Sequence, residues 1–252
     1  MNKKAVFRKM ATLIWRESGD PSVYGFVELD VSEVKERDMV LALVIDALNH
    51  TIMENPELNT MIKWGQIVQR KDSLISVMVN IPGPQNDLSL LNLPVGPGLT
   101  IESIKKNVLE KSQQIRAYKD PHLGPLLKIV RFLPKWMLKR FLGLYSFLIY
   151  ELDTRLGIKF IPHKPFGAVI ISNVGSLGIK KALLPLVPLA RASMMISIGK
   201  SSPEARVVDG NICIRDIVHL GITFDHRLFD GSHAAKMLKD FENFFYGKQD
   251  SP

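Results

Sequence analysis

The chain has 252 residues, of which 46% are hydrophobic and 23% charged, and these values exclude a disordered or collagenous polypeptide. Its formal net charge is +8, so its surface is expected to attract anions such as phosphate groups. Its single cysteine, Cys213, excludes an intramolecular disulfide and a multi-cysteine metal site. The sequence has no zinc-finger spacing and no RNP-like aromatic run, so a nucleic-acid partner is not expected.

The first part of the chain is predicted to form a helix, a strand and a second helix. Apolar residues recur at helical spacing over residues 5–17. Apolar residues and glycine alternate with other side chains over residues 23–31, as in a strand with one buried face. Helical periodicity returns over residues 39–54 and ends before Pro56, because a proline disfavours helical backbone in the residue before it.

The middle of the chain predicts one strand and one charged helix. Residues 74–81 are rich in apolar and β-branched side chains, which favour a strand, and Pro82-Gly83-Pro84 ends it. Residues 100–116 are helical in pattern, with Thr100 placed as the N-cap.

Residues 121–162 combine leucine and phenylalanine with basic side chains that fall on one helical face. The longest uncharged run there, residues 141–150, is far shorter than the ~20 residues that a membrane span needs. We expect the segment to pack on the domain or on a partner subunit. The alternative is a helix that lies on an anionic membrane surface.

The last third predicts a sheet and a closing helix. Asp209-Gly210-Asn211 is typical of a hairpin turn, and residues 232–246 predict a helix that ends at Gly247. The ranges with strand character are 168–173, 192–199, 205–208 and 212–224. With no linker that would divide the chain, these elements predict one α/β domain with a mixed sheet.

The segment Asp225-His226-Arg227-Leu228-Phe229-Asp230-Gly231 joins the last predicted strand to the last predicted helix. His226 therefore lies on a short loop between two regular elements, and an imidazole can accept a proton near neutral pH. Asp230 lies at the start of the helix, where a carboxylate accepts hydrogen bonds from the free N–H groups of the first turn. We expect Asp230 to act as an N-cap as well as to order this loop.

These residues match a DHR-x-x-DG signature, and two other segments match motifs in the same order. Residues 171–178 are similar to an ISNLG-type turn, and residues 56–59 read PELN. Together they resemble the catalytic domain of the dihydrolipoyl acyltransferase component of 2-oxo-acid dehydrogenase complexes, whose fold is shared with chloramphenicol acetyltransferase. The resemblance covers nearly the whole chain. It implies a single catalytic domain over residues 1–252 with an α/β (α+β) two-layer sandwich of mixed β-sheet and flanking helices.

The resemblance also implies the site. His226 would be the general base that takes the proton from a thiol of coenzyme A or of a dihydrolipoyl group. Ser172 would donate a hydrogen bond to the oxyanion, although without the resemblance it is an ordinary strand-end serine. Family members are trimers with the site between subunits, so the two residues would come from different chains. Four further positions would shape the two loops: Asn173, Gly175, Arg227 and Gly231.

The remaining polar residues are weaker candidates. Lys180 and Lys181 follow the Ser172 turn and could contact a phosphate of coenzyme A, or be a solvated pair. His233 is expected to be structural, and Cys213 to be a buried, inert thiol. The other histidines lack nearby ligand-type partners in the sequence, so no metal is expected: His50, His122, His163 and His219.

The leading hypothesis is a cytoplasmic, coenzyme A-dependent acyltransferase with a thiol or hydroxyl acceptor. No lipoyl or peripheral-subunit-binding sequence is recognised, so any lipoyl group would come from another protein. The family's apolar C-terminal tail is not found, which predicts an isolated homotrimer. Residues 121–162 are interpreted as an insertion. The alternatives are a non-catalytic trimeric scaffold that docks through this insertion to a membrane or protein, and an antibiotic-acetylating enzyme.

Overall fold

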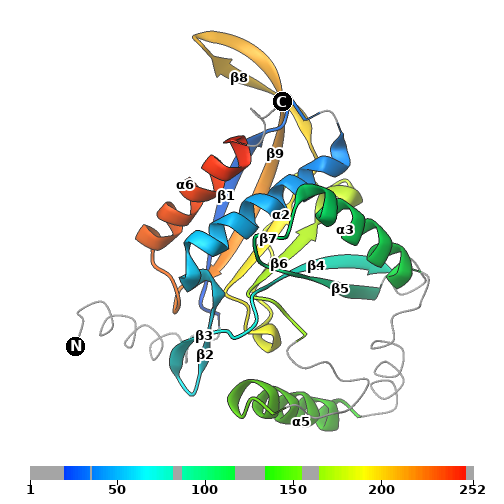
Figure 1. Cartoon of the computed structure of the whole chain (residues 1–252), viewed down its shortest axis with the longest axis vertical. Coiled ribbons are helices and arrows are strands. Elements are labelled where there is room, and N and C mark those ends of the chain that lie inside the picture. The colour runs from blue at the N-terminus through cyan, green and yellow to red at the C-terminus, as the bar shows by residue number, and fades with distance from the viewer. Residues whose placement is uncertain (1–19, 35, 82–86, 117–133, 155–164, 248–252) are drawn as a thin grey trace.

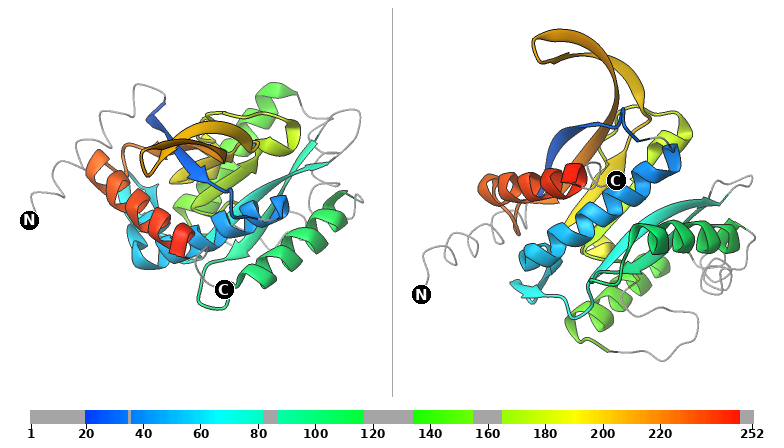
Figure 2. Two further views of the ribbon diagram at one scale, coloured as in Figure 1. Left: turned by 90° about the horizontal axis from the view of Figure 1, so that it is seen from above. Right: turned by 45° about the horizontal axis from the view of Figure 1, so that its top comes forward.

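In a computed structural model of the chain, the structure describes residues 20–34, 36–81, 87–116, 134–154 and 165–247. They form two layers, a twisted sheet and three long helices that cover one of its faces (Figure 1, Figure 2). The predicted helix over residues 5–17 and much of the 121–162 segment lie outside the described residues.

Seven strands form the large sheet, in the order β1-β9-β7-β6-β4-β5, and β8 pairs with β9 off this path. The strands are β1 (Ser22–Asp30), β4 (Leu74–Ile81), β5 (Asp87–Pro94), β6 (Val169–Asn173), β7 (Met194–Ile198), β8 (Ser202–Val208) and β9 (Asn211–Asp225). β6 runs parallel to β4 and to β7, and the other pairs are antiparallel. The sheet is therefore mixed, as predicted. A separate hairpin is formed by β2 (Thr60–Lys63) and β3 (Gln66–Gln69).

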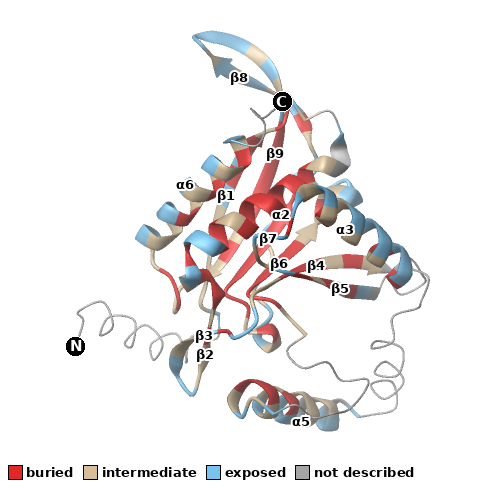
Figure 3. Ribbon diagram, viewed as in Figure 1, coloured by how far each residue is buried: buried red, intermediate tan, exposed pale blue. Residues whose placement is uncertain are grey.

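The helices α2, α3 and α6 lie on one face of the sheet, and α5 lies apart from them below it (Figure 1). Their bounds are α2 (Arg37–Glu54), α3 (Ile101–Arg116), α5 (Lys135–Ser146) and α6 (Gly231–Gly247). The main core lies between this helical layer and the sheet (Figure 3). Leu29, Ile45 and Phe245 are fully buried there, and each such side chain stabilises the fold by about 1.5–3 kcal/mol.

The other face of the central strands is covered by the segment between β6 and β7. A smaller apolar cluster there includes Ile170 and Met195. The Thr223 hydroxyl donates a hydrogen bond to the Leu184 carbonyl oxygen at 2.6 Å. An added Cβ at Gly221 would lie 1.9 Å from the Ala182 carbonyl oxygen, so only glycine allows this close approach. The crossing segment is therefore fixed against the sheet.

The predicted elements that fall on described residues are confirmed, with shifts of one to a few residues at their ends. The hairpin turn has Asp209 at φ 50° and Gly210 at φ 79°, the backbone of a type I′ turn. Ser103 N–H donates to the Thr100 hydroxyl at 3.3 Å, so Thr100 caps α3 as expected. β2, β3 and β5 were not anticipated, because short strands such as β2 and β3 carry too little periodic pattern.

The described part of the 121–162 segment is α5 followed by a π-helical turn, Phe147–Glu151. Its buried side chains, Tyr145, Ile149 and Tyr150, form a cluster with Met61 of β2. Trp136 on the other side is 67% exposed. This part thus packs on the domain while it presents apolar side chains outward. Among the helices that the structure describes, none is long and apolar enough to cross a membrane.

Candidate active site

The loop between β9 and α6 is anchored by the core on both sides of His226. The His226 N–H donates to the Pro21 carbonyl oxygen at 2.9 Å, just before β1. The N–H groups of Leu228 and Phe229 both donate to the Asp225 carbonyl oxygen, and both side chains are buried. His226 itself is half-buried. The loop therefore holds a half-buried imidazole, whose Nδ1 is buried, on a rigid base.

Asp225 and Arg227 form a bidentate ion pair around this histidine. Arg227 Nε donates to Asp225 Oδ1 at 2.9 Å, and its Nη2 donates to Oδ2 at 2.6 Å. The Arg227 N–H also donates to Oδ1, at 3.0 Å. Because the Asp225 carboxylate is almost fully buried, these bonds fix the turn in which His226 lies.

Asp230 caps α6, as its position in the sequence predicts. Its Oδ1 accepts a hydrogen bond from the Ser232 hydroxyl at 2.6 Å and one from the His233 N–H at 3.1 Å, and it contacts His233 Nδ1. These hydrogen bonds, that from Ser232 foremost, hold the pKa of Asp230 well below its usual range. His233 is thereby part of the cap. At Gly231 an added Cβ would meet no heavy atom within 4 Å, so space does not require glycine there.

Ser172 lies near the end of β6, between Met78 of β4 and Ser197 of β7. The next residue, Asn173, accepts a hydrogen bond from the Ser176 N–H through Oδ1 at 3.2 Å and so caps a 3₁₀ turn, Val174–Leu177. A Cβ on Gly175 would lie 2.6 Å from the Gly199 carbonyl oxygen. Glycine is therefore required at this turn.

Within one chain, the fold does not bring Ser172 and His226 together. Ser172 lies beside Ser197, and Ser197 pairs with Gly221. His226 follows Gly221 by five residues, which is about 17 Å along a strand, and two strand spacings of about 5 Å separate β6 from β9. The two residues thus lie about 20 Å apart, at opposite ends of the central sheet.

Lys180 and Lys181 lie at the Ser172 end and are both exposed. Lys181 is close enough to Glu204 for its charge to help lower the pKa of that carboxyl. Neither lysine is near His226 of the same chain. Cys213 lies on β9 and is half-buried rather than buried, which corrects that expectation, because the β8–β9 hairpin extends beyond the body of the sheet (Figure 1).

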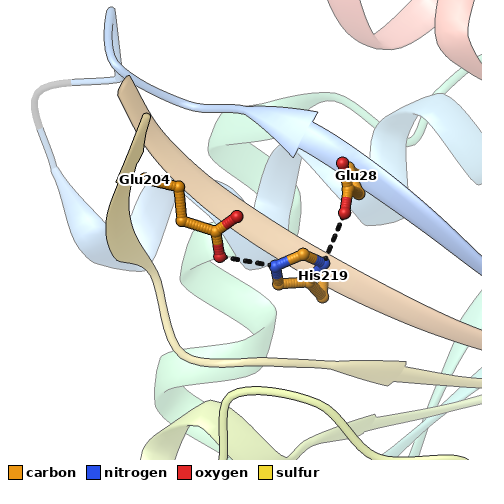
Figure 4. Close-up of side chains that lie close together, drawn as sticks. All are labelled: Glu28, Glu204 and His219. Atoms are coloured by element: carbon orange, nitrogen blue, oxygen red, sulfur yellow. Dashed lines mark hydrogen bonds and ion pairs between the residues drawn. The ribbon is translucent and has the colours of Figure 1, made fainter. Parts of the chain in front are cut away.

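A group that sequence reasoning missed surrounds His219, which we expected to lack such partners. His219 Nε2 lies 2.7 Å from Glu204 Oε1, and its Nδ1 lies 3.4 Å from Glu28 Oε1 (Figure 4). His50 likewise lies 3.8 Å from Asp46. The hydrogen bond to His219 is the main reason why the pKa of Glu204 is lowered. The pairing of β1 and β8 with β9 creates this cluster, and no sequence spacing reveals it.

Ligand atoms of Glu28, Glu204 and His219 lie within 4.8 Å of one another. However, the two carboxylates lie beside different nitrogens of the His219 ring, Glu204 beside Nε2 and Glu28 beside Nδ1. Arg206 Nη2 also lies 2.7 Å from Glu28 and 2.9 Å from Glu204, where it already supplies a cation. The cluster is therefore best described as an ion-pair network that ties β1, β8 and β9 together.

Arg70 is the other residue that no sequence pattern singled out. It is 7% exposed, and its guanidinium donates to the carbonyl oxygens of Phe166, Ala190 and Arg191. Burial lowers its pKa. These carbonyls precede β6 and β7, so Arg70 fixes the start of both strands at the His226 end of the sheet.

The part of the chain from β6 to α6 matches a known family. Residues 166–246 match the model of the 2-oxoacid dehydrogenases acyltransferase (catalytic domain). The matched residues are about a third of the chain. The dihydrolipoyllysine-residue acetyltransferase component of the pyruvate dehydrogenase complex of Rickettsia bellii is 35% identical to the chain over 78 residues, which are 31% of this chain and 18% of that protein. Its counterpart in Rickettsia typhi is 32% identical over 78 residues, 31% of this chain and 19% of that protein. The alignment therefore spans under a fifth of the length of these curated relatives.

Solved structures extend the likeness of fold to the rest of the chain. A probable dihydrolipoamide acetyltransferase of Listeria monocytogenes has a TM-score of 0.66 at 16% identity, over 100% of this chain and 96% of that one. The dihydrolipoamide acetyltransferase of Azotobacter vinelandii has a TM-score of 0.62 at 17% identity, over 95% and 86%. A chloramphenicol acetyltransferase has a TM-score of 0.50 at 12% identity, over 94% of both chains. The predicted chloramphenicol-acetyltransferase-like fold is confirmed.

Proposed function

We propose that this chain transfers an acyl group between coenzyme A and a thiol, such as a dihydrolipoyl group, or a hydroxyl acceptor. The observation that carries the proposal is the loop of His226, fixed by the Asp225–Arg227 pair and by the Asp230 cap, within the part of the chain that matches an acyltransferase family.

In the proposed mechanism, the His226 imidazole accepts the proton of the acceptor thiol. A thiol with a pKa of about 8.5 is mostly protonated near neutral pH, so this removal makes the nucleophile. The thiolate attacks the thioester carbonyl, and the Ser172 hydroxyl of a neighbouring copy donates a hydrogen bond to the oxyanion. The intermediate then expels the thiolate of coenzyme A, which takes the proton back from the imidazolium. The new thioester forms as the old one breaks.

A neighbouring copy of the chain is needed because Ser172 and His226 of one chain lie at opposite ends of its sheet. We therefore propose a homotrimer with a site between each pair of subunits. Lys180 and Lys181, exposed at the Ser172 end, are candidates to meet the phosphates of coenzyme A in that site. In the Azotobacter vinelandii dihydrolipoamide acetyltransferase, a serine, a histidine and an asparagine are described as having a role in the catalytic mechanism, and the asparagine follows the histidine by four residues. Here the residue four positions after His226 is Asp230.

The test is acyl transfer from acetyl-coenzyme A to dihydrolipoamide, followed by chromatography of both thioesters. We expect His226→Ala to lower kcat/KM by about 10²–10⁴-fold and Ser172→Ala by about 10²–10³-fold. His50→Gln changes a histidine on α2 outside the proposed site and should leave the rate unchanged. Transfer by His226→Ala within about threefold of the parent rate would contradict the general-base role. The same assay with graded acyl chains and with alcohols identifies the acyl group and the acceptor.

A second candidate is a trimeric scaffold that docks on an anionic membrane through residues 121–162. The observation that favours it is the set of exposed apolar side chains on and after α5, Trp136, Leu144 and Phe147. Flotation with phosphatidylserine vesicles should then recover the whole chain but not a variant without residues 121–162. Equal flotation of both forms removes this candidate.

A further inference from the structure

An apolar cavity of about 220 Å³ lies between the sheet and the helices α2 and α6. Its walls come from β1, β7 and β9 on one side and from the two helices on the other. Thr51 is the one polar side chain among the described residues that line it, and its hydroxyl donates to the Ala47 carbonyl oxygen at 2.7 Å. The described lining therefore offers no free hydrogen-bonding side chain and suits an apolar guest.

The cavity exists because small residues occupy several positions of its wall. Gly25 of β1 has the same strand parity as the buried Val27 and Leu29, so a side chain at this position would face the helical layer. A Cβ added at Gly25 would meet no heavy atom within 4 Å. Ala234 and Ala235 on α6 line the cavity as well. The open volume thus coincides with positions that lack large side chains.

The cavity lies next to the loop that carries His226. Phe224, which lines it, precedes His226 by two residues, and Ala234 follows Asp230 by four. The loop therefore joins the two elements, β9 and α6, that form opposite walls. Phe26 and Ala235 at the rim are exposed, whereas the linings from α2 and β7, such as Leu48 and Met194, are buried. The cavity opens between β1 and α6 and deepens toward the core.

We infer that this cavity holds the saturated chain of the acyl group, an inference that rests on the proposed function. A dry cavity of about 150 Å³ accommodates benzene, so about 220 Å³ has room for a straight chain of about eight carbons. The thioester would remain at His226, and the chain would extend from the loop between β9 and α6. The substrate class is then a medium-chain acyl thioester rather than an acetyl thioester.

The first measurement is calorimetric binding of octanoyl-coenzyme A and acetyl-coenzyme A to His226→Ala, which prevents turnover. Because each buried methylene favours binding, the affinity for octanoyl-coenzyme A should be at least about tenfold higher than that for acetyl-coenzyme A. Gly25→Val, added to this background, fills the cavity with a residue that strands favour and should reduce the difference to less than about threefold. Ala235→Phe fills the cavity from α6 and replaces Gly25→Val in this comparison if Gly25→Val does not fold. Tyr24→Ile changes the neighbouring residue, on the other face of β1, and should keep the full difference.

The second measurement is binding of 1-octanol to the unaltered protein, which does not depend on the proposed function. We expect binding that competes with octanoyl-coenzyme A and is lost in Gly25→Val. If octanol does not bind, for instance because another part of the chain fills the cavity, the inference is overturned. Equal affinity for the two thioesters, or a chain-length preference that survives in folded Gly25→Val, overturns it too. Failure of the proposed function alone would instead appear as undiminished transfer by His226→Ala, with octanol binding retained.

Discussion

The two ends of the central sheet carry the two halves of the proposed site and are built differently. At the His226 end, charged side chains fix the backbone: the Asp225–Arg227 pair, the Asp230 cap and the buried guanidinium of Arg70. At the Ser172 end, the turn is fixed by the Asn173 amide and by a close backbone contact that only Gly175 allows. Each end is rigid by itself, but about 20 Å of sheet separates them. A chain of this fold can therefore preorganise both halves of a site without completing it.

The largest expected effect is complementation between the two ends. His226→Ala and Ser172→Ala subunits should each be inactive alone, because every site lacks one group. When equal amounts of the two variants assemble at random, about a quarter of all sites pair an intact His226 with an intact Ser172 of the neighbour. Co-expression of the two variants, followed by the transfer assay, should therefore restore about a quarter of the parent rate. Mixed trimers without activity would place the site within one chain or elsewhere.

Arg70→Met should cause the largest loss of stability at the His226 end. Methionine fills similar space but leaves the carbonyl oxygens of Phe166, Ala190 and Arg191, which are buried or partly buried, without this donor. We expect the free energy of unfolding to fall by about 3 kcal/mol. Urea denaturation measures it. Lys71→Met is the matched control, since the Lys71 side chain is 79% exposed and its ion pair should contribute less than about 1 kcal/mol. Equal effects of the two changes would contradict the structural role of Arg70.

Arg227→Ala leaves the Asp225 carboxylate with fewer partners in a largely buried position. We expect a loss of about 2–3 kcal/mol in the free energy of unfolding and a lower kcat, because the turn that holds His226 loosens. Arg227→Lys keeps the charge but cannot form two parallel hydrogen bonds, so its loss should be smaller. Thermal unfolding and the transfer assay measure the two effects. A fully stable Arg227→Ala with unchanged kcat would show that the ion pair does not position the loop.

Asp230→Ala should have the smallest effect: loss of the N-cap should lower the free energy of unfolding by about 1 kcal/mol. The size of this loss should depend on pH. The hydrogen bonds from Ser232 and His233 lower the pKa of Asp230 from 3.8 in the folded state. The stabilisation is therefore complete above pH 3.8 and declines as the pH falls further toward the folded-state pKa. Urea denaturation of the parent protein and of Asp230→Ala across this pH range should show that the difference between their free energies of unfolding becomes smaller in acid. Asp230→Asn retains a capping oxygen and should lie between them. A difference that does not change with pH would contradict the ionic cap.

The sequence predicted the elements with strong local signals. The alternation in β1, the strand character of β9, the helix α6 and the Asp209-Gly210 turn depend only on residues near one another, and the structure confirms them. The cluster of Glu28, Glu204 and His219 was missed, because its members lie on three strands whose register is a property of the sheet. Arg70 was missed for a similar reason: its partners follow it by about 100 residues or more.

The order of residues from Asp225 to Gly231 by itself determined that a histidine lies on a loop between strand and helix, beside a capping carboxylate. Local backbone preference and N-capping are sufficient for that. Only the tertiary structure decided how far this loop is from Ser172, and that an apolar cavity opens next to it. The distance follows from strand order and register, and the cavity from the fit of α2 and α6 on the sheet around Gly25. Both depend on contacts between residues that are far apart along the chain.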